Sequence, residues 1–301
     1  MVFSRWPRIA IALVAALAAP LGLTACTAAA APTTTAFTAT QSGTPVSLGL
    51  DTPAMLKTAL PAALQAYIAA KGGHSAVDVV DRTTGATIAV NENRTFQTAS
   101  IMKFDILATR LLQTQKAGGS LSSSQRGQAF LMITQSNNQA ASSLYAEDHT
   151  ASGVAAANAT FGLKNTHPGA NGVWGKTHTT AADQIRLLSA VFNPKGPLSS
   201  ANQQYMMSLM SKVEPDQAWG ITAAKTPAAT GVYVKNGWDE MDAFGHMEGD
   251  NSIGRIVEPG HDWMIATMSN YNRTDAAGEK ILGNLAKIAV SGLRLETLPP
   301  N

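Results

Sequence analysis

Apolar and polar positions after residue 50 alternate in two regular ways, one typical of helices and one of strands. The spacing predicts a helix from Pro53, which suits a first helical position, to a stop at Gly72. Two β-type runs follow at 75–80 and 86–91, joined by the turn-forming "DRTTG", and they predict a hairpin. The helical spacing is carried by four residues: Leu56, Leu60, Leu64 and Ile68.

The middle of the chain is helical in pattern, and strand patterns return after it. A long loop rich in Gly, Asn and His, "KNTHPGANGVWGKTHTT", interrupts the helical block at 164–180. A closing helix of about 275–291 has one apolar face, and we expect Gly292 to end it. Helices are predicted at 100–116, 122–135, 151–161, 180–192 and 200–210, and strands at 231–238, 252–259 and 262–270.

The order of these elements predicts an α+β fold. Two strands precede the helical block, three follow it, and one helix stands at each end. Hairpin-type connections favour an antiparallel sheet. We therefore expect an antiparallel five-stranded sheet flanked by the terminal helices, with an all-helical lobe inserted and a site in the cleft between lobe and sheet.

The first 50 residues indicate export rather than folding. Residues 1–25 combine Arg5 and Arg8 with the apolar run "IAIALVAALAAP", which is typical of a signal peptide. The "LTAC" at its end resembles a bacterial lipobox, which implies cleavage before Cys26, lipidation of its sulfur and anchoring outside the cytoplasmic membrane. An ordinary secretory signal is the alternative. Residues 26–50, rich in Thr, Ala and Pro, predict a flexible tether.

Composition excludes several other classes. Cys26 is the single cysteine, so no intramolecular disulfide and no cysteine-based zinc site can form. The chain carries 22 basic and 20 acidic residues with no basic run, which argues against nucleic-acid binding. Residues 51–301 are long enough for one hydrophobic core, and we expect a monomer that needs no cofactor.

The stretch "QTASIMKF" raises the first chemical candidate, because Ser100 and Lys103 stand three residues apart near a helix start. With 21 Ser and 12 Lys in the chain, about one Ser-x-x-Lys is expected by chance, so the match needs context. The two side chains share a helix face, and the helix N-terminus favours developing negative charge. A lysine acts as a base toward a serine when burial or a second cation lowers its pKa.

Two other stretches hold residues of the same chemical kind. "ITQSNNQAASSL" places Ser136 and Asn138 at the end of an apolar helix, and "YVKNGWDE" places Lys235 inside a strand, followed by Gly237. A glycine there lets a ligand approach the backbone. Taken singly, each has a plain structural explanation, a helix end in the first case and a solvated strand face in the second.

The order Ser-x-x-Lys, Ser-x-Asn, Lys-x-Gly resembles the active-site set of class A β-lactamases and penicillin-binding proteins. The resemblance extends over about 53–295, because the order of strands and helices is similar too. It implies a serine hydrolase acting on β-lactams or on peptidoglycan-stem-like peptides.

The same resemblance implies a role for each matching position. Ser100 would be the nucleophile, Lys103 its proton acceptor, and Ser136 would pass a proton to the leaving nitrogen. Lys235 would be the second cation that keeps Lys103 partly neutral and attracts a substrate carboxylate. Asn138 would hold the substrate amide, Asn236 and Gly237 would adjoin the substrate, and the backbone N–H groups of Ser100 and Trp238 would form the oxyanion hole.

The sequence departs from the family pattern in several places. Asn137 replaces an aspartate, Asn236 replaces a threonine whose hydroxyl meets the substrate carboxylate, and Ser100 and Ser136 are closer together than usual. The family's omega loop supplies a glutamate for deacylation, whereas residues 149–182 contain no Asp or Glu. His167 and His178 are the candidate replacement bases, with exposed loop histidines as the alternative.

Other candidate sites have simpler explanations. His246, Glu248 and Asp250 would share one side of an extended segment as metal ligands, but a polar Gly-rich loop explains them better, and we expect no metal. No carboxylate pair indicates glycoside hydrolysis. Four tryptophans suit either a sugar-binding groove or ordinary packing, and Trp238, beside the Lys-x-Gly, is also a candidate substrate contact. The four are Trp174, Trp219, Trp238 and Trp263.

Three functions therefore remain open. The first is a class A type β-lactamase working through an acyl-Ser100 intermediate. The second is a D-Ala-D-Ala peptidase or penicillin-binding protein that deacylates slowly, and the third is a non-catalytic envelope lipoprotein. The intact set of five polar residues argues against the third, and Asn236 and the missing loop carboxylate argue for it.

Overall fold

A computed structural model describes residues 37–41, 44–48, 53–241, 245 and 247–297. The predicted signal peptide, Cys26 and His246 lie outside these residues. Within the segment predicted as a tether, strands β1 (Phe37–Gln41) and β2 (Thr44–Leu48) pair antiparallel. The tether itself stays a prediction.

The centre of the fold is a five-stranded antiparallel sheet in the order β4-β3-β9-β8-β7. The strand from the start of the domain, β3, therefore pairs with the last strand, β9, and the helical lobe is inserted between β4 and β7. The strands are β3 (Ser75–Asp81), β4 (Thr87–Val90), β7 (Gly231–Met241), β8 (Met247–Glu258) and β9 (His261–Asn272).

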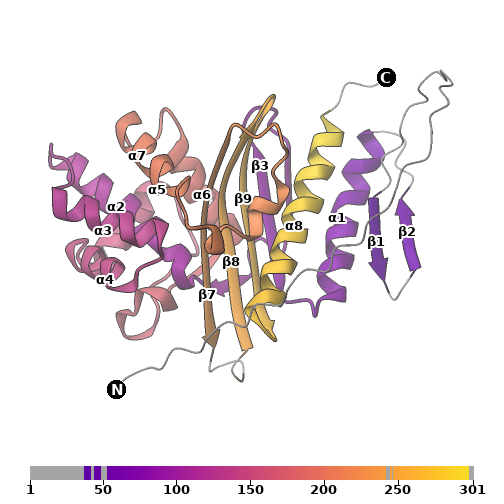
Figure 1. Ribbon diagram of the computed structural model, residues 1–301, viewed down its shortest axis with the longest axis horizontal. Helices are drawn as coiled ribbons and strands as arrows, with labels where there is room; N and C mark the ends of the chain where they lie inside the picture. The colour runs from indigo at the N-terminus through magenta and orange to yellow at the C-terminus, as the bar shows by residue number, and fades with distance from the viewer. Residues whose placement is uncertain (1–36, 42–43, 49–52, 242–244, 246, 298–301) are drawn as a thin grey trace, which may run out of the picture. The chain divides into compact units, whose positions relative to one another are not determined.

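Each face of the sheet has its own apolar core. The terminal helices α1 (Pro53–Ala70) and α8 (Asp275–Glu296) cover one face, where Leu64, Ile265 and Leu285 are fully buried. The lobe covers the other face, as Figure 1 shows. This arrangement confirms the predicted α+β fold with an inserted helical lobe.

The lobe contains the five predicted helices and one that the sequence did not indicate. The unpredicted helix, α4, runs from Asn138 to Glu147, and it is short and rich in Ala and Ser, so its sequence lacks a strong apolar repeat. Its inward face still buries Leu144 and Tyr145. The predicted helices are α2 (Met102–Lys116), α3 (Ser123–Thr134), α5 (Thr150–Phe161), α6 (Ala181–Phe192) and α7 (Ser200–Met210).

Short elements connect these helices and strands. Strands β5 (Thr95–Gln97) and β6 (His178–Thr180) pair antiparallel and join the lobe's entry to the 164–180 loop. The 3₁₀ turns are η1 (Ala99–Ile101), η2 (Ala170–Gly172), η3 (Trp174–Lys176), η4 (Pro215–Gln217) and η5 (Gly220–Ala224).

The predicted stop at Gly292 is wrong, because α8 continues to Glu296. A Cβ built on Gly292 would lie 2.5 Å from Leu60 Cδ1. Gly292 is therefore a contact point at which α8 approaches α1, and its small size serves packing rather than termination.

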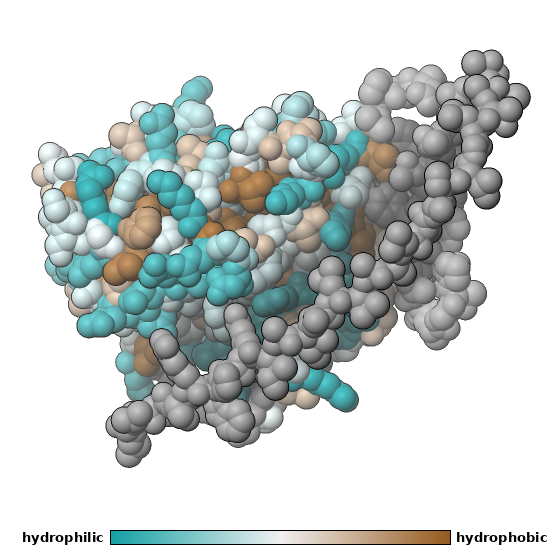
Figure 2. Space-filling view, viewed as in Figure 1, coloured by the Kyte–Doolittle hydropathy of each residue, from teal (hydrophilic) through white to brown (hydrophobic). Residues whose placement is uncertain are grey.

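The visible surface is largely polar, with apolar patches between polar side chains (Figure 2). Among the described residues, the large apolar side chains that remain exposed include Trp238, at 38%, on strand β7. Since Trp238 follows the Lys-x-Gly stretch, its exposure makes it part of the setting of the candidate site.

Candidate active site

Ser100 lies in the 3₁₀ turn η1, immediately before α2, rather than inside the helix. The turn is entered through Ala99, whose φ of 45° is in the left-handed region. Asn251 of β8 fixes the approach, because its Nδ2 donates to the carbonyl oxygens of Gln97 at 2.8 Å and Thr98 at 3.3 Å. Ser100 is thus held at a defined corner beside the sheet.

Lys103 connects Ser100 to Ser136 and Asn138. Its Nζ lies 2.6 Å from Ser100 Oγ, 2.9 Å from Ser136 Oγ, and 2.7 Å from both Ser136 O and Asn138 Oδ1. The side chain is fully buried, and this burial lowers the pKa of Lys103 to about 7. A neutral amine has two N–H donors and one lone pair. It can donate to Ser136 O and Asn138 Oδ1 while accepting the hydroxyl proton of Ser100.

Ser136 and Asn138 occupy the corner between α3 and α4. Ser136 has a φ of 53°, so the chain reverses there and its side chain points back to Lys103. Asn137 caps α4, since its Oδ1 accepts a hydrogen bond from the backbone N–H of Ala140 at 2.9 Å. The departure from aspartate at position 137 therefore keeps the capping acceptor.

Lys235 enters the same group from β7. Its Nζ donates to Ser136 Oγ at 3.0 Å and to Asn236 O at 2.7 Å. Ser136 Oγ therefore bridges the two lysines. Burial, followed by the charge of Lys103, lowers the pKa of Lys235 well below its usual value. Burial is the cause of the lowered pKa of Lys103, and the charge of one lysine acts on the other only at Lys235. The predicted role of Lys235 as the cation that keeps Lys103 partly neutral stays a prediction.

Gly237 brings β7 against the turn that holds Ser100. A Cβ on Gly237 would lie 2.6 Å from the backbone nitrogens of both Ser100 and Ile101. Only glycine permits this approach. The next residue, Trp238, packs edge-on against Trp219, with ring centroids 6.0 Å apart. The two indoles form an aromatic wall beside Gly237.

The amide donors of Asn236 are used inside the protein. The residue is fully buried, and its Nδ2 donates to the carbonyls of Gln217 at 2.7 Å and Trp219 at 3.2 Å. It thereby holds the segment that carries Trp219. Its predicted contact with substrate stays a prediction, and the described geometry gives it a positioning role instead.

The 164–180 loop is tied down at its base. His167 and His178 exchange backbone hydrogen bonds of 2.9 and 2.8 Å, and both residues are exposed. Asp183 accepts hydrogen bonds from the backbone N–H groups of Lys164 and Asn165. Within the described part of the chain, neither histidine side chain hydrogen-bonds to the Ser100–Lys103 pair. The geometry favours the alternative of exposed loop histidines.

Trp174 is the residue of this loop that reaches the candidate site. Lys103 Nζ lies 5.0 Å from the centre of the Trp174 ring, within cation–π range. The sequence named Trp174 as a general packing or groove residue and missed this contact. An isolated aromatic residue in a Gly-rich loop was the available signal. Trp263, by contrast, is fully buried in the sheet.

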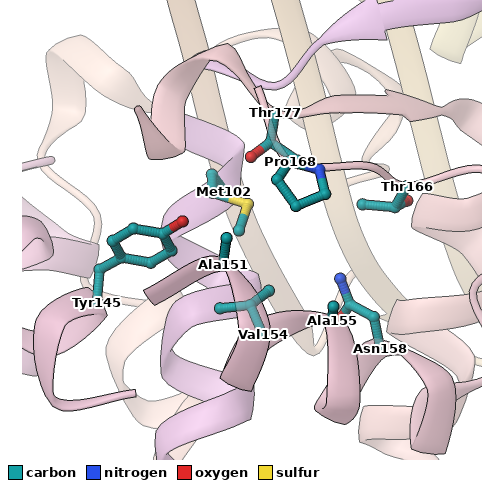
Figure 3. Close-up of a pocket in the computed structure, with 9 residues that line it drawn as sticks. All are labelled: Met102, Tyr145, Ala151, Val154, Ala155, Asn158, Thr166, Pro168 and Thr177. Carbon is teal, nitrogen blue, oxygen red and sulfur yellow. The ribbon is translucent and has the colours of Figure 1, made fainter. Parts of the chain in front are cut away.

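A small cavity lies beneath the same loop, apart from the Ser100 group. Its volume is about 10 Å³, which is room for about one water molecule and not for a substrate. Helix residues line it from below and loop residues from above (Figure 3). The lining consists of Met102, Tyr145, Ala151, Val154, Ala155, Asn158, Thr166, Pro168 and Thr177.

The remaining candidates give no metal or membrane site among the described residues. His246 lies outside them, and Asp250 is buried, with Oδ2 accepting a 2.7 Å hydrogen bond from Asn272. Burial first, and then nearby carboxylates, raise the pKa of Asp250 to about 8. The described residues contain no cluster of three His, Cys, Asp or Glu suited to a metal ion. No described helix is long and apolar enough to span a membrane.

Solved structures with the same fold include an extended-spectrum β-lactamase and the protein PBP-A. The extended-spectrum β-lactamase TLA-3 has a TM-score of 0.69 and 18% identity, covering 78% of this chain and 98% of its own. PBP-A has a TM-score of 0.68 and 17% identity, covering 79% and 96%. A mutant of PBP-A, solved as an acyl-enzyme complex with penicillin G, has the same score and identity, covering 79% and 97%.

Sequence comparison gives a family and a named relative. A protein named "Putative lipoprotein LppW", from Mycobacterium tuberculosis and Mycobacterium bovis, is 27% identical over 176 residues, covering 56% of this chain and 55% of the relative. The match thus spans about half the length of these relatives. The sequence model described as the beta-lactamase enzyme family matches residues 59–128 and 124–293, most of the folded domain. This chain therefore belongs to the β-lactamase enzyme family.

Proposed function

We propose that this chain is a serine acyl-transfer enzyme that opens β-lactam amides through an acyl-Ser100 intermediate. The observation that carries the proposal is the 2.6 Å contact between Lys103 Nζ and Ser100 Oγ, together with the burial that lowers the pKa of Lys103 to about 7. A lysine with this pKa is substantially neutral at physiological pH and is positioned to accept the serine proton.

The proposed acylation is balanced in atoms and protons. The Lys103 amine takes the hydroxyl proton while Ser100 Oγ bonds to the lactam carbonyl carbon, and the resulting oxyanion faces the backbone N–H groups of Ser100 and Trp238. The carbon–nitrogen bond then breaks. Ser136 passes its proton to the departing nitrogen and regains one from Lys103 through their 2.9 Å contact.

Binding of the substrate rests on the other members of the group. Asn138 would donate from its amide NH₂ to the substrate's exocyclic amide while its Oδ1 stays with Lys103. Lys235 would attract the substrate carboxylate. Because burial disfavours the charged form of Lys235, arrival of an anion would raise the pKa of Lys235 and draw a proton onto it.

A D-Ala-D-Ala peptidase that deacylates slowly is the second candidate function. It is favoured by one observation, the lack of any Asp or Glu in residues 149–182, which removes the usual base for deacylation from the loop. The acylation chemistry at Ser100 would be the same for a peptide and for a β-lactam, so the two functions differ in the lifetime of the acyl-enzyme.

The test is a time course of the full-length protein with penicillin G, read by intact mass, with Ser100→Ala as the control. We expect an adduct of the mass of the drug in the wild type and none in Ser100→Ala. A lasting adduct supports the slowly deacylating enzyme, and product without adduct supports an efficient β-lactamase. Neither adduct nor product would contradict the proposal and leave the non-catalytic lipoprotein.

We also propose that the mature protein is anchored to the outer side of the cytoplasmic membrane by lipid on Cys26. The "LTAC" stretch and the name of the LppW relative support this. In cells fed a labelled fatty acid, the wild type should incorporate label and fractionate with membranes. Cys26→Ala should lose both properties, and label retained in Cys26→Ala would contradict the anchor.

A further inference from the structure

The indole of Trp174 covers the buried amine at the centre of the candidate site. Lys103 Nζ is surrounded by oxygen atoms of Ser100, Ser136 and Asn138 from the lobe, and the Trp174 ring, 5.0 Å away, stands over it from the 164–180 loop. Lys103 is fully buried although Ser100 is only partly so. The loop therefore places a large apolar side chain beside the amine.

Hydrogen bonds hold both the side chain of Trp174 and the backbone of its loop. The side chain is fixed because Trp174 Nε1 donates to Ser142 Oγ of α4 at 3.1 Å. The backbone is fixed because Thr98, two residues before Ser100, donates its N–H to Thr177 O at 2.8 Å. The Thr98 hydroxyl also lies 3.5 Å from Trp174 O. The loop turn and the nucleophile turn are thus one hydrogen-bonded unit.

Hydrolysis of an acyl-Ser100 ester needs water at this same place. A water molecule must attack the ester carbon while a base takes its proton, and the bond from that carbon to Ser100 Oγ must break as Oγ recovers a proton. Residues 149–182 supply no carboxylate, and the Lys103 amine lies 2.6 Å from Ser100 Oγ, which makes it the candidate base. A water molecule that uses this base must hydrogen-bond to Lys103 Nζ, on the side of the amine that the Trp174 indole covers.

We infer that Trp174 is a water-excluding residue that prolongs the acyl-enzyme by keeping hydrolytic water from the Lys103 side of the ester. The inference rests on the proposed acylation of Ser100 and on the second candidate function, slow deacylation, for which it gives a physical cause. It makes the 164–180 loop an apolar shield at the site rather than the carrier of a base.

The first experiment measures the lifetime of a preformed adduct. Full-length protein is acylated with penicillin G, free drug is removed, and loss of the adduct is followed by intact mass. We expect at least a tenfold shorter lifetime in Trp174→Ala and an intermediate value in Trp174→Phe. Val173→Ala, an exposed neighbour in the same loop, is the matched control and should behave as wild type. An unchanged or longer lifetime in a Trp174→Ala protein with wild-type circular dichroism would overturn the inference.

The second experiment tests the shield without any β-lactam. Reductive methylation with formaldehyde and cyanoborohydride modifies accessible amines. Peptide mass mapping then measures the methylation of Lys103 separately from that of the other lysines. Modification of Lys103 should be several-fold faster in Trp174→Ala than in Val173→Ala. Equal rates would overturn the shield. If penicillin G gives no adduct in any variant while Lys103 shows the expected difference, the proposed function fails and the covering role of Trp174 stands.

Discussion

The pH dependence of acylation follows from the burial of Lys103, and it can be worked out in advance. The residue is fully enclosed, and burial lowers the pKa of Lys103 to about 7. Only the neutral amine can accept the proton of Ser100. Because the pKa is lowered, the neutral form gains population at a much lower pH than for a lysine in water, and acylation should accelerate as the pH rises through about 7.

The size of the effect comes from the titration curve of one group. With a pKa of about 7, about half of Lys103 is neutral at pH 7, about a tenth at pH 6 and about a hundredth at pH 5. The rate should therefore fall nearly tenfold per pH unit below 6 and reach a plateau above about 8. A lysine in water has a pKa of about 10.4, so its neutral fraction would still be rising tenfold per unit at pH 9.

The assay is the burst rate with a chromogenic β-lactam in stopped flow, measured from pH 5 to pH 9.5 at constant ionic strength. Lys103→Arg is the control, since guanidinium stays protonated throughout this range, and it should show no burst. A rate independent of pH, or one that still rises tenfold per unit at pH 9, would refute the assignment of Lys103 as a base with a pKa near neutrality.

Substitutions of Gly237 and Gly292 test close contacts through the free energy of unfolding and, for Gly237, also through the burst rate. Gly237→Ala places a Cβ 2.6 Å from Ser100 N, so urea unfolding should show a free energy of unfolding lower by about 1–3 kcal/mol. The burst should also slow. Wild-type values of both quantities would contradict the close contact. Gly292→Ala meets Leu60 and should also lower the free energy of unfolding. Gly127→Ala, at an exposed position of α3 with open space around it, should instead raise the free energy of unfolding by up to about 1 kcal/mol. Equal effects of Gly292→Ala and Gly127→Ala on the free energy of unfolding would mean that α1 and α8 do not touch at Gly292.

The sheet and most of the lobe could be predicted because their residues signal structure locally. Strand patterns at 252–259 and 262–270 identified β8 and β9, and helical spacing identified five helices of the lobe. Helix α4 was missed because alanine and serine leave its apolar repeat weak, and its stability depends on the cap at Asn137 and on packing of Leu144. The packing contribution arises only when the chain has folded.

The candidate site also has one part that the sequence predicted and one part that it did not. The order of Ser100, Lys103, Ser136 and Lys235 predicted a group, and the structure brings these side chains within hydrogen-bonding distance. The place of Trp174 could not be predicted, because it depends on the path of a loop without periodicity. That path is set by backbone hydrogen bonds between segments that are distant in sequence.

Asn236 shows how a departure from the family pattern can be structural rather than chemical, and it gives the last prediction. If the asparagine simply replaced a substrate-binding hydroxyl, Asn236→Thr would restore the family's residue and speed acylation. In this fold its Nδ2 satisfies the buried carbonyls of Gln217 and Trp219, and a threonine has one donor on a shorter side chain. We therefore expect Asn236→Thr to lose about 1–3 kcal/mol of unfolding free energy, the cost of an unsatisfied buried acceptor, and to acylate no faster.

Urea unfolding and the burst rate of Asn236→Thr decide between these two readings of position 236. The exposed Asn93→Thr is the control for the substitution itself and should change stability by less than about 0.5 kcal/mol. A stable Asn236→Thr with faster acylation would show that the hydroxyl was what the site lacked. A destabilised one would mean that Asn236 serves the loop carrying Trp219, so the aromatic wall beside Gly237 depends on the very residue that departs from the pattern.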